Sequence, residues 1–155
     1  MTKKIALLGS TGSIGVQTLA CCKALGYRIN VLAANKSVDL LEQQAREFSP
    51  RCVVVSDKNA YTDIKMRLAD LPVQILAGVD GMCEAAALPE NDVVCNAVVG
   101  MVGLRPTLAA IEAGKTVALA NKETLAAGGQ LVMEAVARTG AGLLPVDSEH
   151  SAIFQ

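Results

Sequence analysis

Tryptophan is absent from this sequence of 155 residues, and only two Phe and two Tyr are present. The chain is nevertheless 52% hydrophobic, and its apolar residues are chiefly Ala, Val, Leu and Ile. Such residues are typical of a parallel sheet that is covered by helices on both faces. Only 19% of the residues are charged, which argues against a disordered chain, and the length suits one domain with its own core.

The sequence also lacks an excess of charge of one sign, and it lacks a long apolar run. The formal net charge is −1, without a basic tail or stripe, which argues against a nucleic acid as partner. No apolar run approaches the ~20 residues that a membrane span needs. The amino terminus is basic and then apolar, but the apolar run over 5–8 stops at a glycine-rich turn, so we expect no signal peptide.

The cysteine pattern excludes two further classes of protein. Five cysteines are present, an odd number, and none of them forms a CxxC pair. This argues against a disulfide framework and against a zinc site. Cys52 and Cys95 lie at the edges of valine runs, so we expect buried thiols there, as suits a reducing cytoplasm.

The hydrophobic periodicity alternates between strand and helix along the whole chain. It predicts a parallel α/β sheet of the Rossmann-like, doubly wound type, with about seven strands and helices on both faces. We expect a single domain over 1–155. The predicted strands are 4–9, 28–34, 51–55, 73–77, 92–99, 116–120 and 142–146, and the predicted helices are 13–25, 38–48, 60–69, 81–88, 105–113 and 123–139.

The first strand runs into the segment LLGSTGSIG, in which Gly9, Gly12 and Gly15 open the first helix. Glycines permit a tight turn and the close approach of a pyrophosphate, and the free N–H groups of a helix start attract phosphate. The hydroxyls of Ser10, Thr11 and Ser13 could add donors. The alternative is an ordinary turn with an N-capping serine, but the strand–loop–helix context favours nucleotide binding.

The second strand ends without the acidic residue that holds the ribose of NAD in the usual dinucleotide fingerprint. The chain has Asn35, Lys36 and Ser37 there instead. A cation with hydrogen-bond donors suits a 2′-phosphate, so the sequence favours NADPH. The alternative is a solvated loop in which Ser37 caps the following helix.

Two more polar segments follow predicted strands. Asn121, Lys122 and Glu123 come directly after the sixth strand, at the edge of the sheet where α/β proteins place their ligands. Asp147 and Glu149 follow the last strand, and in an extended chain both would point the same way, ~6.5–7 Å apart. Two such carboxylates favour a hard cation such as magnesium or manganese. For the first segment, the alternative is an ordinary, solvated helix start. For the second, it is a pair of solvated acidic residues that precede a helix beginning near Ser148.

Four segments together resemble one family over essentially the whole chain. They are LLGSTGSIG, REFSPR, VVGMVGLRPTLAAIEAGKTVALANKETL and LLPVDSEHSAIFQ. The family that they resemble is 1-deoxy-D-xylulose 5-phosphate reductoisomerase. The resemblance implies an NADPH-dependent enzyme of non-mevalonate isoprenoid biosynthesis that uses Mg²⁺, Mn²⁺ or Co²⁺. Its substrate is a sugar phosphate, 1-deoxy-D-xylulose 5-phosphate, and its product is 2-C-methyl-D-erythritol 4-phosphate. It further implies a homodimer in the cytoplasm or in a plastid stroma.

The resemblance also implies roles for single residues. Asp147 and Glu149 would bind the metal, Ser148 would contact the substrate, and Lys122 would lie near the substrate and the nicotinamide. Lys122, Ser148 and Glu149 are thus the candidate catalytic residues. The residues implied in cofactor binding are Thr11, Gly12, Ser13, Ile14, Asn35, Lys36, Ser37, Asn121, Lys122 and Glu123, with Gly100 and Met101 beside the nucleotide.

The family's enzymes are much longer than this sequence. Their third metal carboxylate, the lid over the active site and the phosphate-binding residues follow the segment that the resemblance covers. We therefore expect the chain to supply the NADPH-binding portion and part of the metal site, and to be inactive alone. Two alternatives remain open: a stand-alone NADPH-binding module, and a truncated product without activity.

Overall fold

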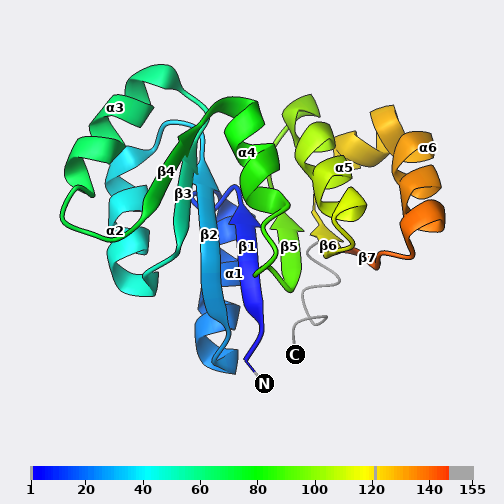
Figure 1. Cartoon of the computed structure of the whole chain (residues 1–155), viewed down its shortest axis with the longest axis horizontal. Helices are drawn as coiled ribbons and strands as arrows, with labels where there is room; N and C mark the ends of the chain where they lie inside the picture. The colour runs from blue at the N-terminus through cyan, green and yellow to red at the C-terminus, as the bar shows by residue number, and fades with distance from the viewer. Residues whose placement is uncertain (1, 121, 147–155) are drawn as a thin grey trace.

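A computed structural model describes residues 2–120 and 122–146, which form one sheet between two layers of helices (Figure 1). Each strand but the last is followed by a helix, as the periodicity predicts. The strands are β1 (Lys4–Leu8), β2 (Arg28–Ala34), β3 (Cys52–Val55), β4 (Gln74–Ala77), β5 (Val93–Asn96), β6 (Thr116–Leu119) and β7 (Leu143–Pro145). The helices are α1 (Ser13–Leu25), α2 (Val38–Phe48), α3 (Lys58–Arg67), α4 (Gly78–Ala86), the 3-10 turn η1 (Met101–Gly103), α5 (Leu104–Glu112) and α6 (Lys122–Thr139).

The seven strands lie in the order β4-β3-β2-β1-β5-β6-β7, and every neighbouring pair is parallel. The chain first builds outward from β1 to β4, and then returns to the other side of β1 with β5. The direction of winding therefore reverses between β1 and β5. In open α/β sheets this reversal opens a crevice beyond the carboxyl ends of the strands, where ligands bind. The predicted Rossmann-like architecture is confirmed.

Two apolar layers hold the sheet. Alternate residues of one strand point to opposite faces, so Ile5 and Leu7 of β1 pack with α1, α2 and α3. Ala6 and Leu8 of the same strand pack with α4, α5 and α6 on the other face. Figure 1 shows α4 and α5 in front of the sheet and α1 behind it. Because the central strands are covered on both faces, their sequences are largely apolar, with polar residues near their first positions, such as Lys4 in β1 and Asn30 in β2.

Several predicted boundaries were wrong by a few residues, for local reasons. Helix α3 begins at Lys58 instead of residue 60, because the Asp57 carboxylate accepts hydrogen bonds from Asn59 N–H (2.8 Å) and Ala60 N–H (3.1 Å). Strand β5 stops at Asn96 instead of residue 99. Helices α4 and α5 start three residues and one residue earlier than predicted.

Helix α6 contains the paired glycines that looked unfavourable in the sequence. Gly128 has non-helical angles (φ −126°, ψ 19°), so the helix is kinked there. A Cβ at this position would lie 2.5 Å from a methyl carbon of Leu104. The glycine thus lets α6 approach α5 closely, which explains its place inside a helix.

The five cysteines are all unpaired in the structure, as the sequence predicts. Cys22, Cys52 and Cys95 are fully buried. Burial, the largest cause, raises the pKa of Cys22 to about 11 and the pKa values of Cys52 and Cys95 to about 12. Within the described residues, no helix is long and apolar enough to cross a membrane.

The burial of these thiols predicts their chemical reactivity. Thiolates are the reactive species, so a buried thiol with a raised pKa should resist alkylation at pH 8. We expect iodoacetamide to modify Cys21 and Cys83, which are partly exposed, well before the other three. Peptide mass spectrometry after timed alkylation measures this, with urea-unfolded protein as the control in which all five react. Early modification of Cys52 or Cys95 in the folded chain would contradict the described packing.

Candidate functional site

A pocket of about 390 Å³ lies beyond the carboxyl ends of β1, β2, β3 and β5, where the winding of the sheet reverses. It lies between the β1–α1 loop on one side and the β5–α5 loop on the other. The loop after β2 also lines it, so three of the loops expected around the cofactor meet in this pocket. The lining residues are Gly9, Thr11, Gly12, Ala33, Ala34, Asn35, Ser56, Met82, Ala97, Val98, Val99 and Val102.

The β1–α1 loop is fixed to its neighbours by backbone contacts. The N–H groups of Gly9 and Ser10 both donate to the carbonyl oxygen of Ala33 at the end of β2 (2.8 and 2.9 Å). Gly9 has φ +89°, which favours glycine, and a Cβ there would lie 2.7 Å from the carbonyl oxygen of Ala97. Gly9 is therefore required by the close contact between the two loops that border the pocket.

Gly12 and Gly15 have different roles from each other. A Cβ on Gly15 would lie 2.1 Å from the carbonyl oxygen of Gly9, so Gly15 is required by the packing of α1 against the loop. Gly12 has ordinary angles (φ −81°, ψ 177°), and a Cβ there would meet nothing closer than 3.9 Å. Nothing inside the described chain requires a glycine at position 12. Gly12 lines the pocket, and the missing side chain leaves room for a ligand to reach the backbone.

The start of α1 offers unpaired donors beside this open space. Gly12 is the N-cap residue and makes no side-chain capping bond. The first N–H groups of a helix have no intrahelical acceptor, and the backbone N–H groups of Ser13 and Ile14 find no other acceptor within the described residues. Such N–H groups, with the positive end of the helix dipole, favour an anion.

The hydroxyl groups predicted near this anion site divide into two sets. Thr11 lines the pocket and Ser13 is exposed at the first residue of α1. Ser10, in contrast, is completely buried and does not line the pocket, so the prediction that its hydroxyl serves a ligand was wrong. The sequence could not show this, because the side of the loop that faces the core depends on how α2 packs beneath it.

The loop after β2 borders the same pocket. Asn35 lines it, and its carbonyl oxygen accepts a hydrogen bond from Asp57 N–H (3.1 Å). Lys36 and Ser37 are exposed next to it. Lys36 makes no ion pair with any described residue, which leaves a free cation at the rim. Ser37 occupies the N-cap position of α2, as the alternative interpretation expects. Its hydroxyl makes no capping hydrogen bond, so the capping role does not account for a hydroxyl group at this position.

Asn96, which the sequence analysis missed, shapes the opposite wall of the pocket. Its side chain is fully buried at the end of β5. Its amide donates to the carbonyl oxygen of Gly103 (2.9 Å) and to Thr107 Oγ1 (2.7 Å), and its Oδ1 accepts from Val98 N–H (3.1 Å). These bonds end the strand and hold the loop over 97–103. A polar residue at the end of an otherwise apolar strand was the signal in the sequence.

Gln44, also missed, supports the glycine-rich loop from below. It lies on α2, is 6% exposed, and its Nε2 donates to the carbonyl oxygen of Ser10 (2.9 Å). Its Oε1 and the Ser10 hydroxyl oxygen are both buried and find no hydrogen-bond partner among the described residues. Buried polar atoms are nearly always hydrogen-bonded in proteins, so a bridging water is expected between the loop and α2.

The remaining predicted site residues come from the segments after β6 and β7. Lys122 is the first residue of α6, and Glu123, the second, is exposed. Strands β6 and β7 are parallel, and Val146 N–H donates to the carbonyl oxygen of Leu119 (2.9 Å), so both segments follow strands that end at the pocket's edge of the sheet. Asn121, Asp147, Ser148 and Glu149 lie outside the described residues.

Support for the predicted metal site therefore comes from the sequence only. The described part of the chain holds no group of three or more His, Cys, Asp or Glu side chains that could bind a metal ion. The two carboxylates of the prediction, Asp147 and Glu149, are not in that part.

Comparison with known proteins gives a consistent result. A family model described as 1-deoxy-D-xylulose 5-phosphate reductoisomerase matches residues 5–129. Proteins of that name from Agathobacter rectalis and from a Geobacillus species are 48% and 50% identical to the chain over 99% of its length. The chain spans 40% of the length of each of these relatives.

Solved structures give the same picture. A crystal structure titled DOX-P reductoisomerase in complex with magnesium matches 97% of the chain with a TM-score of 0.92 and 41% identity. A second, titled 1-deoxy-D-xylulose 5-phosphate reductoisomerase from Zymomonas mobilis in complex with NADPH, matches 100% of the chain with a TM-score of 0.89 and 43% identity. The chain covers 38% and 41% of these two proteins.

The contrast between the two glycines of the loop can be tested by stability. Gly15→Ala should destabilise the fold by about 1–3 kcal/mol, because the new methyl group would overlap backbone atoms. This reverses the usual gain of about 0.5–1 kcal/mol for Gly→Ala inside a helix. Gly12→Ala, the matched control, should cost less than about 1 kcal/mol. Urea unfolding followed by circular dichroism measures both, and equal effects would contradict the distinction.

Proposed function

Because the chain belongs to the 1-deoxy-D-xylulose 5-phosphate reductoisomerase family, we propose that it supplies the NADPH-binding portion of such an enzyme. The proposed reaction converts 1-deoxy-D-xylulose 5-phosphate to 2-C-methyl-D-erythritol 4-phosphate with oxidation of NADPH. The proposal extends to a homodimer with a sugar-phosphate substrate. The chain spans 40% of the length of the curated relative from Agathobacter rectalis. The activity of a whole enzyme therefore needs residues that this sequence does not include.

The observation that carries the proposal is the open side of Gly12 next to the unpaired N–H groups of α1. A pyrophosphate has the size and charge to fill this space, since its oxygens would accept from the N–H groups of Ser13 and Ile14. Thr11 could donate its hydroxyl. The relative from Zymomonas mobilis has been solved in complex with NADPH, which agrees with the chemistry of this site.

The choice of NADPH over NADH rests on the loop after β2. Its free cation, Lys36, and the exposed side chains of Asn35 and Ser37 suit a 2′-phosphate. In typical NAD sites an acidic residue after the second strand binds the ribose hydroxyls. No acidic residue follows β2 directly in this chain. The bound cofactor would supply the hydride for reduction of the aldehyde.

The proposed roles of the chain's other residues concern binding and orientation. The winding of the sheet brings the helix start that carries Lys122 and Glu123 to the same edge as the nucleotide pocket. We assign Asn121, Lys122 and Glu123 to the nicotinamide half of the cofactor. Lys122, as a cation, would hold an anionic or polarised oxygen of the substrate, and Ser148 would donate a hydrogen bond to it.

Asp147 and Glu149 are proposed as ligands of a divalent cation, together with oxygens of the substrate. Their hard carboxylate oxygens fit Mg²⁺ or Mn²⁺, and one relative has been solved in complex with magnesium. Co²⁺ is the third ion that the family resemblance implies. Such a cation would stabilise negative charge on substrate oxygens.

A second function, a stand-alone NADPH-binding module, is favoured by one observation. Described residues of this chain form a pocket of about 390 Å³ that includes the glycine-rich loop and the loop after β2. Binding of NADPH therefore does not distinguish a module from an enzyme, and only a measurement of turnover does.

The cofactor preference can be tested with Lys36. Lys36→Glu should weaken NADPH binding by about 1.5–3 kcal/mol, because a charge-assisted hydrogen bond is replaced by repulsion. Binding of NADH, which lacks the 2′-phosphate, should change little. Nucleotide fluorescence titration measures both affinities, with Lys58→Glu as a control for the general effect of charge. Equal affinity of the unchanged chain for NADPH and NADH would refute the assignment.

Gly12→Ala provides a second, independent arm of this test. The added methyl group should leave the fold intact and weaken NADPH and NADH alike, because both share the pyrophosphate. If Gly12→Ala binds NADPH as well as the unchanged chain does, the pyrophosphate does not lie at the start of α1.

Turnover separates the enzyme from its alternatives. A polypeptide of the printed sequence should bind NADPH but show no oxidation of it with 1-deoxy-D-xylulose 5-phosphate and Mn²⁺. The reason is that the chain spans only 40% of the length of its relatives, and that the family's third metal carboxylate and its lid follow the segment that the resemblance covers. The assay follows absorbance at 340 nm. Sustained turnover by this polypeptide would contradict the prediction of an incomplete site.

A further inference from the structure

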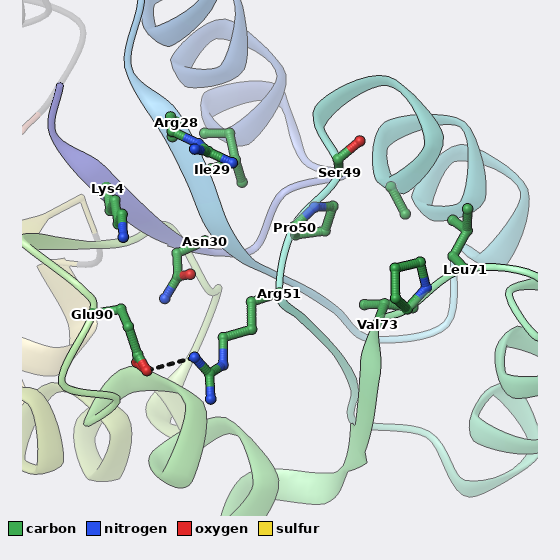
Figure 2. A pocket seen from close by; sticks show the side chains of 12 residues that line it. Lys4, Arg28, Ile29, Asn30, Ser49, Pro50, Arg51, Leu71, Val73 and Glu90 are labelled. Atoms are coloured by element: carbon green, nitrogen blue, oxygen red, sulfur yellow. Dashed lines mark ion pairs between the residues drawn. The ribbon is translucent and has the colours of Figure 1, made fainter.

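A second pocket, also of about 390 Å³, lies at the opposite edge of the sheet, where the strands begin (Figure 2). Its walls come from the first residues of β1 and β2 and from the segments that precede β3, β4 and β5. We call it the amino-edge pocket. Its lining residues are Lys4, Arg28, Ile29, Asn30, Ala45, Ser49, Pro50, Arg51, Leu71, Pro72, Val73 and Glu90. None of them belongs to the nucleotide pocket.

One wall of the amino-edge pocket carries an excess of positive charge. Lys4 and Arg28 form no ion pair with any described residue. Arg51 pairs with Glu90, Nη1 to Oε1 at 2.8 Å, as Figure 2 shows. Asp92 lies nearby, and its carboxylate accepts a hydrogen bond from the backbone N–H of Lys4 (2.8 Å). Three cations thus face two carboxylates, so the wall keeps a positive charge.

The same wall has a buried carboxylate oxygen without a partner. Oε2 of Glu90 is buried and makes no hydrogen bond to any described residue. Asn30 is 8% exposed, and its amide nitrogen donates to Asn91 Oδ1 (2.7 Å). A carboxylate oxygen without a donor repels an anion, so we expect an anion to lie beside Lys4 and Arg28 rather than beside Glu90.

The other wall is apolar. Pro50, Leu71 and Val73 line it, together with Ile29, Ala45 and Pro72. Next to Pro50, Ser49 has a left-handed backbone (φ 49°, ψ 56°), the only such residue other than glycine in the described chain. This turn ends α2 and brings Pro50 and Arg51 to the pocket.

Three backbone N–H groups at this edge of the sheet are already hydrogen-bonded and are not free to bind a ligand. The backbone N–H groups of Arg28, Arg51 and Gln74 at this edge all donate to neighbouring carbonyl oxygens. A ligand would therefore be recognised by side chains, with charge on one wall and apolar contact on the other. Small-molecule sites combine such features: a concave, largely apolar space with a few convergent polar groups.

We propose that the amino-edge pocket binds a small anion that carries an apolar group, such as an organic phosphate or carboxylate. Arg28 and Lys4 hold the anion, Arg51 is shared between the anion and Glu90, and the apolar group lies against Pro50, Leu71 and Val73. This site is separate from the nucleotide pocket and does not depend on the proposed function. Its ligand binds together with NADPH, because the two pockets lie at opposite edges of the sheet.

The test uses phenyl phosphate and phenylacetate as probes, with inorganic phosphate and benzyl alcohol as the matched compounds that lack the apolar group or the charge. Binding to the 155-residue chain saturated with NADPH is followed by ¹H–¹⁵N NMR shifts. At least one of the two probes should bind more tightly than both control compounds, and shift amides around Arg28, Arg51 and Val73. The stronger probe tells whether the anion is a phosphate or a carboxylate. Binding should weaken as salt is added.

Two substitutions with opposite expected signs make the result specific. Arg28→Ala should weaken the probe roughly fivefold, the effect of losing one partly exposed charge contact. Glu90→Gln should strengthen it, because Arg51 loses its carboxylate partner and the pocket becomes more positive. Lys3→Ala, a neighbouring cation that does not line the pocket, is the control and should change nothing.

Four results with the probes and the Arg28 variant would overturn the proposal. They are the absence of saturable binding, displacement of the probe by NADPH, equal binding of inorganic phosphate, and an affinity that is the same in Arg28→Ala as in the unchanged chain. A loss of binding in Lys3→Ala as large as in Arg28→Ala would also overturn it, because the attraction would then be a general effect of surface charge.

Discussion

The burial of the central strands on both faces is the constraint on which the rest of the molecule depends. Strands β1 and β3 have no exposed apolar residue, and helices cover them from both sides. A ligand cannot reach the faces of such a sheet. Polar and charged side chains that serve a ligand must therefore lie at its two edges, in the loops that join strands to helices. The nucleotide pocket and the amino-edge pocket are both found there.

At the carboxyl edge, the pocket is shaped more by backbone than by charged side chains. Gly9 and Gly15 permit contacts that a methyl group would prevent, and Asn96 and Gln44 hold the two loops by hydrogen bonds from the core. Of these three loop glycines, only Gly12 has open space where a side chain would stand, and it lines the pocket. This arrangement suits a phosphate ligand, because rigid N–H donors need no reorganisation when the anion arrives.

Charges on the outer helices have a different role. Arg46 joins α2 to Asp70, and Arg67 joins α3 to Asp39 and Glu42. Side-chain hydrogen bonds, first of all to Asp70 for Arg46 and to Asp63 for Arg67, raise the pKa of both guanidinium groups. The pairs are largely exposed, so each contributes little, about 0–1 kcal/mol. They serve to align neighbouring helices, while Lys36, Lys4 and Arg28 have no such partners in the described part of the chain and remain available at the pocket edges.

The sequence by itself determined the fold class, the alternation of strands and helices, and the position of the glycine-rich loop, because these follow from local periodicity and from turn residues. Helices α1 and α2 and strand β2 have the predicted bounds. Tertiary structure alone decided which hydroxyls face the pocket, since Ser10 is buried under the packing of α2 and Thr11 is not. It also decided the strand order and the partners of Asn96 and Gln44, and it formed the amino-edge pocket from residues far apart in the chain, such as Lys4 and Glu90. Periodicity reports only whether a position is buried, whereas these features depend on contacts between segments that the sequence does not place next to each other.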